Sequence, residues 1–202
     1  MLNNMFTQQW GAAVDEHDPV WQFRQGKKLD TGDGVEQDKA KALSWYRKSA
    51  EQGYAEAQLL LGIIYDQGIG VTQDYAEAVT WYTKAAEQGY ARAQYNLAAM
   101  YDEGLGVDRN YQQAVEWYRK AAEQGFARAQ FNLGSMYFKG DGVVKNAVTA
   151  YMWVQLAAAQ GLEEQAKDLI ALQPPMSSVE IKKAKTLLAA WRAKHKTHVG
   201  KS

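Results

Sequence analysis

Residues 54–89 read YAEAQLLLGIIYDQGIGVTQDYAEAVTWYTKAAEQG, and residues 90–125 read YARAQYNLAAMYDEGLGVDRNYQQAVEWYRKAAEQG. The two stretches align without an insertion, and the pattern continues on both sides with a period of 36 residues. A fixed period of about 20–50 residues is typical of stacked supersecondary units, each of which buries its apolar face against the next unit. The same phase carries four tryptophans, at Trp45, Trp81, Trp117 and Trp153.

Each unit predicts two helices joined by a tight loop. In residues 54–89, apolar side chains recur four residues apart from Ala57 to Tyr65 and form one helical face. Gly68 follows as a C-terminal stop, because glycine enters the left-handed conformation there without steric cost. Asp74 then predicts the N-cap of a second helix.

Three kinds of recurring residue are expected to pack rather than to bind. The four tryptophans are interpreted as core between units, because aromatic residues dominate buried area. Gly104 and Gly106 are expected to be structural, with at least one of them at positive φ. Small residues in the first helices, such as Gly62, are expected to let the paired helix come close, which offsets the roughly 1 kcal/mol cost of a helical glycine.

The unit A-x-A-Q-x-x-L-G-x-x-Y-x-x-G-x-G-V-x-x-D-x-x-x-A-x-x-W-x-x-K-A-A-x-x-G resembles the Sel-1-like repeat, a branch of the tetratricopeptide superfamily. The match is best over residues 54–125, good over 126–161 and partial over 18–53. The resemblance implies an all-α fold, a right-handed α-solenoid of antiparallel helix pairs. It also implies a module that binds proteins or peptides and is not an enzyme.

The period and the resemblance together divide the chain into segments. Residues 1–17 are expected to form an N-terminal cap, and residues 18–161 to hold four repeats, at 18–53, 54–89, 90–125 and 126–161. Residues 162–202 are expected to hold C-terminal capping helices and a basic tail. Ser177 and Glu180 predict a capping box for the last helix, whose apolar face carries Ile181, Ala184, Leu188 and Trp191.

Composition excludes several classes of protein. The 23 basic and 23 acidic residues balance, which argues against a general nucleic-acid-binding or membrane-surface protein. There is no cysteine, so disulfides and thiolate metal sites are excluded. No stretch has the length of a membrane span or the pattern of an export signal. We therefore expect a cytoplasmic protein, or a periplasmic or secreted one if a signal peptide was trimmed.

The residues give little support to catalysis or to ligand-binding motifs. The three histidines lie outside the repeats, and His195 with His198 offers a metal-site alternative to a plain basic tail. The Gly-x-Gly loops lack the third glycine or the Lys-Ser/Thr of phosphate-binding loops. The stretch DTGDGVEQD has the carboxylates of a calcium loop, but the sister loops do not. We predict no enzyme activity, no cofactor and no bound metal.

By the same resemblance, the first helix of each unit lines a concave groove. Residues on its inner face vary between units while packing positions repeat, which marks a face that stacking does not dictate. This face carries aromatic and arginine residues, the usual types at interface hot spots. One asparagine lies beside this face in each of two units. These two asparagines either hold a partner's backbone or carboxylate, or bond only to neighbouring helices. The predicted partner-binding residues are Phe23, Leu59, Arg92, Tyr95, Asn96, Arg128, Phe131, Asn132 and Phe138.

The sequence therefore predicts a bacterial protein-binding module, monomeric when free, that scaffolds or inhibits a partner protein bound in the groove. A narrower alternative is an immunity or inhibitor protein that neutralises a toxin or secreted effector enzyme. A second alternative is nucleic-acid association through the segment from Lys182 to Ser202, which has seven Lys or Arg residues and no acid.

Overall fold

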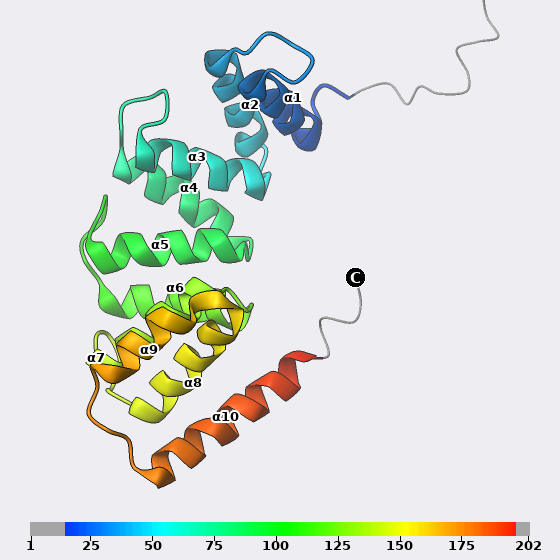
Figure 1. The fold of residues 1–202 in the computed structure, drawn as a ribbon. Helices are drawn as coiled ribbons and strands as arrows, with labels where there is room; N and C mark the ends of the chain where they lie inside the picture. The colour runs from blue at the N-terminus through cyan, green and yellow to red at the C-terminus, as the bar shows by residue number, and fades with distance from the viewer. Residues whose placement is uncertain (1–14, 197–202) are drawn as a thin grey trace, which may run out of the picture.

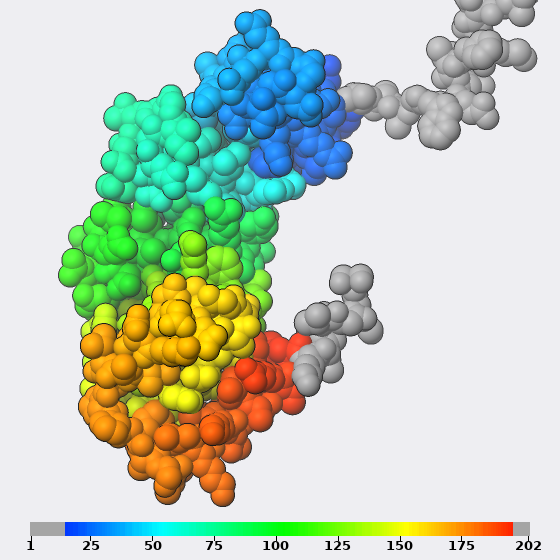
Figure 2. Space-filling model, viewed as in Figure 1, coloured from blue at the N-terminus to red at the C-terminus, as the bar shows by residue number. Residues whose placement is uncertain are grey.

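The computed structural model describes residues 15–196, and all of their regular structure is helical. Consecutive helices pack as pairs, and the pairs stack in chain order into a C-shaped array (Figures 1 and 2). The predicted all-α solenoid is confirmed. The elements are α1 (Pro19–Thr31), α2 (Lys39–Glu51), α3 (Ala55–Gln67), α4 (Tyr75–Glu87), α5 (Ala91–Glu103), α6 (Tyr111–Glu123), α7 (Ala127–Lys139), α8 (Ala147–Ala157), a short π-helical turn η1 (Ala158–Leu162), α9 (Glu163–Ala171) and α10 (Ser178–Lys196).

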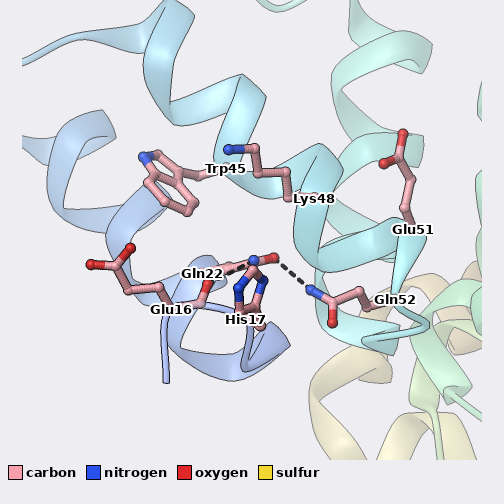
Figure 3. Close-up of a pocket in the computed structure, with 7 residues that line it drawn as sticks. All are labelled: Glu16, His17, Gln22, Trp45, Lys48, Glu51 and Gln52. Atoms are coloured by element: carbon pink, nitrogen blue, oxygen red, sulfur yellow. Dashed lines mark hydrogen bonds between the residues drawn. The ribbon is translucent and has the colours of Figure 1, made fainter. Parts of the chain in front are cut away.

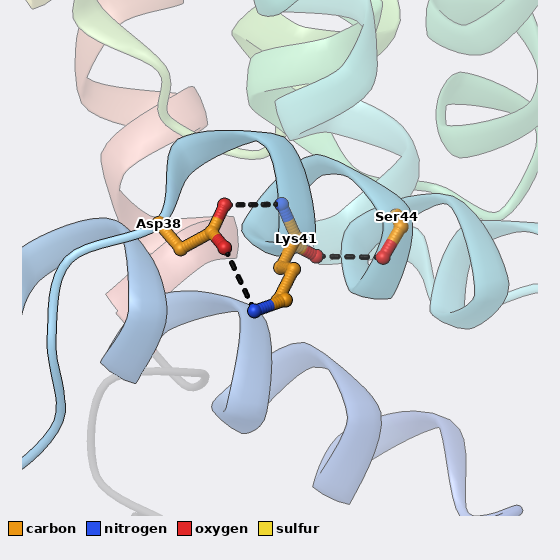
Figure 4. A network of polar contacts seen from close by, with 3 residues as sticks. All are labelled: Asp38, Lys41 and Ser44. Atoms are coloured by element: carbon orange, nitrogen blue, oxygen red, sulfur yellow. Dashed lines mark hydrogen bonds and ion pairs between the residues drawn. The ribbon is translucent and has the colours of Figure 1, made fainter.

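A side-chain cap starts the second helix of each pair. At α2 the Asp38 carboxylate accepts from the Lys41 backbone N–H at 2.9 Å and pairs with Lys41 Nζ at 3.1 Å (Figure 4). Ser44 Oγ, one turn further along, donates to the Lys41 carbonyl. The bond from the Lys41 backbone satisfies an N–H group that has no partner inside the helix. The four caps are Asp38, Asp74, Asn110 and Asn146.

Glycines fix the loop between the two helices and the distance between them. Gly104 caps α5 with φ 74°, and Gly106 follows with φ 68°, so both adopt the predicted left-handed backbone. In the middle of α3, a Cβ added to Gly62 would lie 2.4 Å from the Tyr82 ring of α4. The helical glycine therefore permits close packing of the pair, as predicted.

A ladder of buried glutamines connects successive units. Gln94 Nε2 donates to the Ala86 carbonyl of the preceding unit at 3.1 Å, and its Oε1 accepts from Gln124 Nε2 at 2.8 Å. Gln124 Nε2 also donates to the Gly89 carbonyl at 2.9 Å. The ladder satisfies backbone carbonyls at helix ends that would otherwise be buried without a partner. Its four rungs are the pairs Gln22–Gln52, Gln58–Gln88, Gln94–Gln124 and Gln130–Gln160.

All four phased tryptophans are expected to be largely buried, and the structure covers two of them more completely than the other two. Trp81 and Trp153 are only 6% and 7% exposed, whereas Trp45 and Trp117 are half-buried. In the first three units a lysine three residues later lies over the ring, the buried Trp81 included, as Lys120 does over Trp117 with Nζ 3.6 Å from the ring centroid. A cation over an aromatic face is favourable, so these rings need not be enclosed by apolar atoms.

The C-terminal helices end the stack in a different way. α9 follows α8 through η1, and α10 packs against α8 and forms one arm of the C (Figure 1). The predicted capping box is present, because Ser177 N donates to Glu180 Oε2 at 2.8 Å and Glu180 N donates to Ser177 Oγ at 3.3 Å. On the predicted apolar face, Ala184 is buried and Ile181, Leu188 and Trp191 are half-buried. Residues 1–14 of the N-terminal cap predicted at residues 1–17, and the tail from residue 197, lie outside the described residues.

No helix in the described part of the chain is long and apolar enough to cross a membrane.

Candidate partner-binding groove

The first helices α1 and α3, together with the start of α5, enclose a cavity of about 240 Å³. Phe23 and Leu59 form part of its base and are only 6% and 4% exposed. The Phe23 ring packs 5.5 Å from the Tyr46 ring and 5.3 Å from the Tyr54 ring, so it belongs to the core as well as to the cavity. Charged groups of both signs stand around this apolar base. The lining residues are Phe23, Lys27, Asp30, Tyr46, Glu56, Leu59, Leu60, Ile63, Tyr90 and Arg92.

The next two first helices, α5 and α7, present aromatic and basic side chains. Tyr95 and Phe131 hold the same position in successive units and are both half-buried, while Arg92 and Arg128 are exposed. The Tyr95 ring packs 5.7 Å from Tyr118 and 5.1 Å from Phe126. The core therefore fixes the orientation of Tyr95 while part of the ring remains accessible.

Below this surface, a tyrosine from each second helix reaches an aspartate of the paired first helix. The Tyr46 hydroxyl donates to Asp30 at 3.3 Å, and the Tyr82 hydroxyl donates to Asp66 at 3.0 Å. In the third unit, Tyr118 lies beside Asp102. Burial raises the pKa of all three tyrosines, so the hydroxyls stay protonated and act as donors.

Asp102 is the carboxyl group in this row whose pKa rises. Burial is the main cause, and the nearby Asp141 charge adds to it. The positive charge of Lys139 and a hydrogen bond from Tyr118 oppose the rise. The third unit therefore keeps a partly desolvated carboxyl beneath the groove surface, which favours the neutral acid.

The two asparagines beside the stripe contact these tyrosines. Asn132 Nδ2 donates to the Tyr118 hydroxyl at 2.9 Å, and Asn96 contacts the Tyr82 hydroxyl. Each asparagine therefore bonds inside the protein, which was one of the two alternatives. The Asn132 Oδ1 atom accepts no hydrogen bond from another described residue, so it could still accept one from a partner.

Phe138 does not extend the apolar stripe along the groove. It is 2% exposed and packs with Ala150, Val154 and Ala166. The other units have aspartate at this position and a tyrosine opposite it, whereas the fourth unit has the apolar pair Phe138 and Val154. Phe138 therefore fills the interior of its helix pair and offers almost no surface to a partner.

The described residues contain no group of three or more His, Asp or Glu side chains placed to hold a metal ion. His195 stacks on Trp191 with ring centroids 3.9 Å apart, and its Nδ1 lies 2.8 Å from the Trp191 carbonyl oxygen. His198, its proposed metal partner, lies outside the described residues. The side chains beside the groove are apolar rings, amides and guanidinium groups.

The repeat units match one family of known sequence. The Sel1 repeat model covers residues 26–54, 55–90, 91–126 and 127–162. The chain belongs to the Sel1 repeat family. Sel1 repeat proteins are in general non-catalytic protein-interaction modules. A search of curated proteins gives no significant match.

Solved Sel1 repeat structures share this fold. A Sel1 repeat protein from Oxalobacter formigenes is 36% identical with a TM-score of 0.72, over 84% of this chain and 74% of that one. The protective antigen c5321 of uropathogenic Escherichia coli is 30% identical with a TM-score of 0.52, over 92% of this chain and 50% of the antigen. Cysteine-rich protein B of Helicobacter pylori is 25% identical with a TM-score of 0.51, over 68% of this chain and 98% of that one.

Proposed function

We propose that this Sel1 repeat chain is a non-catalytic module that binds a segment of a partner protein along its first helices. The observation that carries the proposal is the stretch where the half-buried rings of Tyr95 and Phe131 are flanked by the exposed Arg92 and Arg128. Aromatic and arginine side chains are the types that dominate binding energy at interfaces. Arginine forms paired hydrogen bonds with carboxylates, so acidic side chains of the partner would lie along its path.

Two further features of the groove support this proposal. The cavity with Phe23 and Leu59 at its base lies beside Arg92 and would accept an apolar side chain of the bound segment. Asn132 Oδ1 would accept a hydrogen bond from the segment's backbone, while Nδ2 remains bonded to Tyr118. Apolar anchors and a few fixed polar groups together give both affinity and orientation.

Site-specific photo-crosslinking tests the choice of face. A benzophenone amino acid is placed at Tyr95 in one variant and at Thr80, an exposed residue of the second helix α4, in a matched control. We expect the Tyr95 variant to crosslink a discrete partner in cells and the Thr80 variant not to. Crosslinking from Thr80 in the absence of crosslinking from Tyr95 would place the partner on the second helices and refute the proposal.

The identified partner then allows the interaction to be measured. Tyr95→Ala and Arg128→Ala should each weaken binding by about 1–4 kcal/mol, the usual range for central interface residues. Neither substitution should change the circular dichroism spectrum, because Tyr95 is only half-buried and Arg128 is exposed. If the partner is an enzyme whose activity falls on binding, the module is an inhibitor; if its activity is unchanged, the module is a scaffold.

A further inference from the structure

A second cavity, of about 730 Å³, lies between α10 and the ends of α6 and α8, and none of the predicted partner-binding residues lines it. We refer to it as the α10 cavity. One wall comes from the end of α8 and the turn after it, through Leu156 and Ala159. The facing wall comes from the last turns of α10, through Trp191, Arg192 and His195, and Glu123 at the end of α6 also contributes. In Figure 1, α10 forms the lower arm of the C, and its C-terminal end points towards the open side of the array.

The fourth unit departs from the repeat at the two positions that form the solenoid wall of this cavity. Where Leu156 stands, the three preceding units have lysine, and where Ala159 stands they have glutamate. Both substitutions replace a charge by an apolar group. The positions replaced are Lys48, Lys84 and Lys120 for Leu156, and Glu51, Glu87 and Glu123 for Ala159.

The equivalent surface of the first unit shows what the repeat pattern normally produces. There, a pocket of about 430 Å³ is lined by the ionisable side chains of Glu16, His17, Lys48 and Glu51 around Trp45 (Figure 3). The Lys48 Nζ atom lies 4.5 Å from the Trp45 ring centroid. In the fourth unit, Leu156 and Ala159 replace the residues equivalent to Lys48 and Glu51, so these two positions of the repeat have become apolar.

The α10 wall is aromatic and rigid. The Trp191 ring packs edge-on to Trp153, with centroids 6.1 Å apart and an angle of 71° between the planes. His195 stacks on Trp191 and lies within hydrogen-bond distance of its carbonyl oxygen. These contacts hold the aromatic wall in one position, which lowers the entropy that binding would cost.

The charge around the cavity is predominantly basic. Arg192 and Lys194 contribute to its lining, and the whole of α10 carries six Lys or Arg residues against the single acid Glu180. One carboxylate, Glu123, stands on the solenoid side. Basic charge attracts acidic partners over several ångströms, and arginine recognises carboxylates through paired hydrogen bonds.

We propose that the α10 cavity binds an acidic peptide segment of a partner protein through one bulky apolar side chain. The anchor enters between Leu156, Ala159 and Trp191, and a flanking carboxylate of the peptide pairs with Arg192. The site is separate from the groove of the first helices. A nucleic acid fits the observations less well, because His195 already covers one face of Trp191, on which a base would otherwise stack.

Fluorescence anisotropy with three labelled pentapeptides tests the proposal. The probe DEWED carries both acid and anchor, DEAED lacks the anchor, and KKWKK reverses the charge. We expect DEWED to bind at least about 10-fold more tightly than either control, since burying a large apolar side chain contributes about 1.5–3 kcal/mol. Equal binding of DEWED and DEAED would overturn the proposal, because the cavity would then play no part.

Variants of the full chain locate the binding. Ala159→Glu restores the residue that the other three units carry at an exposed helix end, so it should fold normally and weaken DEWED binding about 10-fold. Arg192→Gln should weaken it several-fold. The matched control Glu87→Ala removes the equivalent acid far from the cavity and should have no effect, whereas Glu123→Ala should tighten binding.

Two further measurements distinguish the α10 cavity from the groove and from a nucleic-acid surface. Tyr95→Ala in the groove should leave DEWED binding unchanged. The crosslinking test of the groove and the peptide test of the α10 cavity therefore have independent outcomes, and either proposal can be refuted while the other stands. Unchanged binding in Ala159→Glu would overturn the proposal. So would a single-stranded oligonucleotide that binds more tightly than DEWED and displaces it, since α10 would then be a nucleic-acid surface.

Discussion

Two glycines at equivalent loop positions should respond very differently to the same substitution. Gly70 and Gly106 both have positive φ, at 71° and 68°. A Cβ added to Gly70 meets no atom within 4 Å, whereas a Cβ added to Gly106 would lie 2.3 Å from the Tyr75 carbonyl carbon and 2.4 Å from its oxygen. The third loop therefore packs directly on the start of α4, and the second loop stands clear of α2.

The expected free-energy losses follow from these contacts. Gly70→Ala introduces only the left-handed conformation of an L-residue, which costs about 1–2 kcal/mol. Gly106→Ala adds an overlap with backbone atoms that cannot rotate away, and such overpacking costs about 1–3 kcal/mol more. We therefore expect a total loss of about 2–5 kcal/mol for Gly106→Ala. Gly142→Ala should resemble Gly106→Ala, because its Cβ would lie 2.4 Å from the Tyr111 carbonyl carbon.

Urea unfolding of the parent and the three variants measures these losses. Each transition is followed by far-ultraviolet circular dichroism and by tryptophan fluorescence, because repeat arrays can unfold unit by unit and the two signals must coincide for a single free energy. The result that would refute the reasoning is an equal loss for Gly70→Ala and Gly106→Ala. It would mean that backbone conformation alone sets the cost and that the contact with α4 does not.

Three further predictions concern the interior. Gln94→Met should lower the free energy of unfolding by about 1–3 kcal/mol, because it removes two hydrogen bonds of the ladder. If the free-energy losses of Gln94→Met and Gln124→Ala were strictly additive in a double-mutant cycle, the two side chains would not be directly coupled. Trp81→Ala should cost about 3–5 kcal/mol and Trp117→Ala clearly less, since Trp117 is half-buried, and the reverse order in urea unfolding would contradict the burial difference. The raised pKa of Asp102 means that its contribution to stability is full below the unfolded pKa and is lost as pH rises through the folded pKa. Asp102→Asn should therefore gain stability relative to the parent as pH rises above about 4, and a flat difference across a pH series of melts would show that Asp102 ionises normally.

The helices and their ends could be predicted from the sequence because their signals are local. Gly68 and Gly104 end first helices, and Asp74 and Asn110 cap second helices, in the positions that the repeat indicated. Each signal acts within a few residues of its own backbone, so one sequence is sufficient to detect it. The 36-residue period then predicted that the units stack on one another, since every unit must bury the same face.

The environment of the tryptophans could not be predicted in the same way. Trp81 and Trp117 share the same phase, yet only Trp81 is buried. The difference depends on the tilt of neighbouring units and on which side chains cover the rings, and neither is a property of the repeat. The glutamine ladder was missed for a related reason, because Gln94 and Gln124 lie 30 residues apart, on different helices, and each also bonds to a carbonyl of the preceding unit.

The sequence did contain a signal that excludes Phe138 from the groove. Positions 30, 66 and 102 are aspartate, and the positions sixteen residues later, 46, 82 and 118, are tyrosine. In the fourth unit both members change together, to Phe138 and Val154. A paired change from polar to apolar indicates two side chains that face each other in the interior, so Phe138 belongs with its partner and not with the variable surface.

The other changes in the fourth unit can be interpreted in the same way, by comparing each changed position with its equivalents in the first three units. Stacking does not require these changes, because the other three units pack in the same way without them. The pair Phe138 and Val154 closes the interior beneath α9, where Ala166 completes the cluster. Leu156 lines the α10 cavity but is also buried, at 4% exposed, whereas Ala159 lines the same cavity and remains exposed. Loss of a charge from an interior follows from burial alone, whereas loss of a charge from an exposed position beside a basic helix does not. Binding of an acidic segment with an apolar anchor accounts for that loss, and Ala159→Glu is the substitution that tests it most directly.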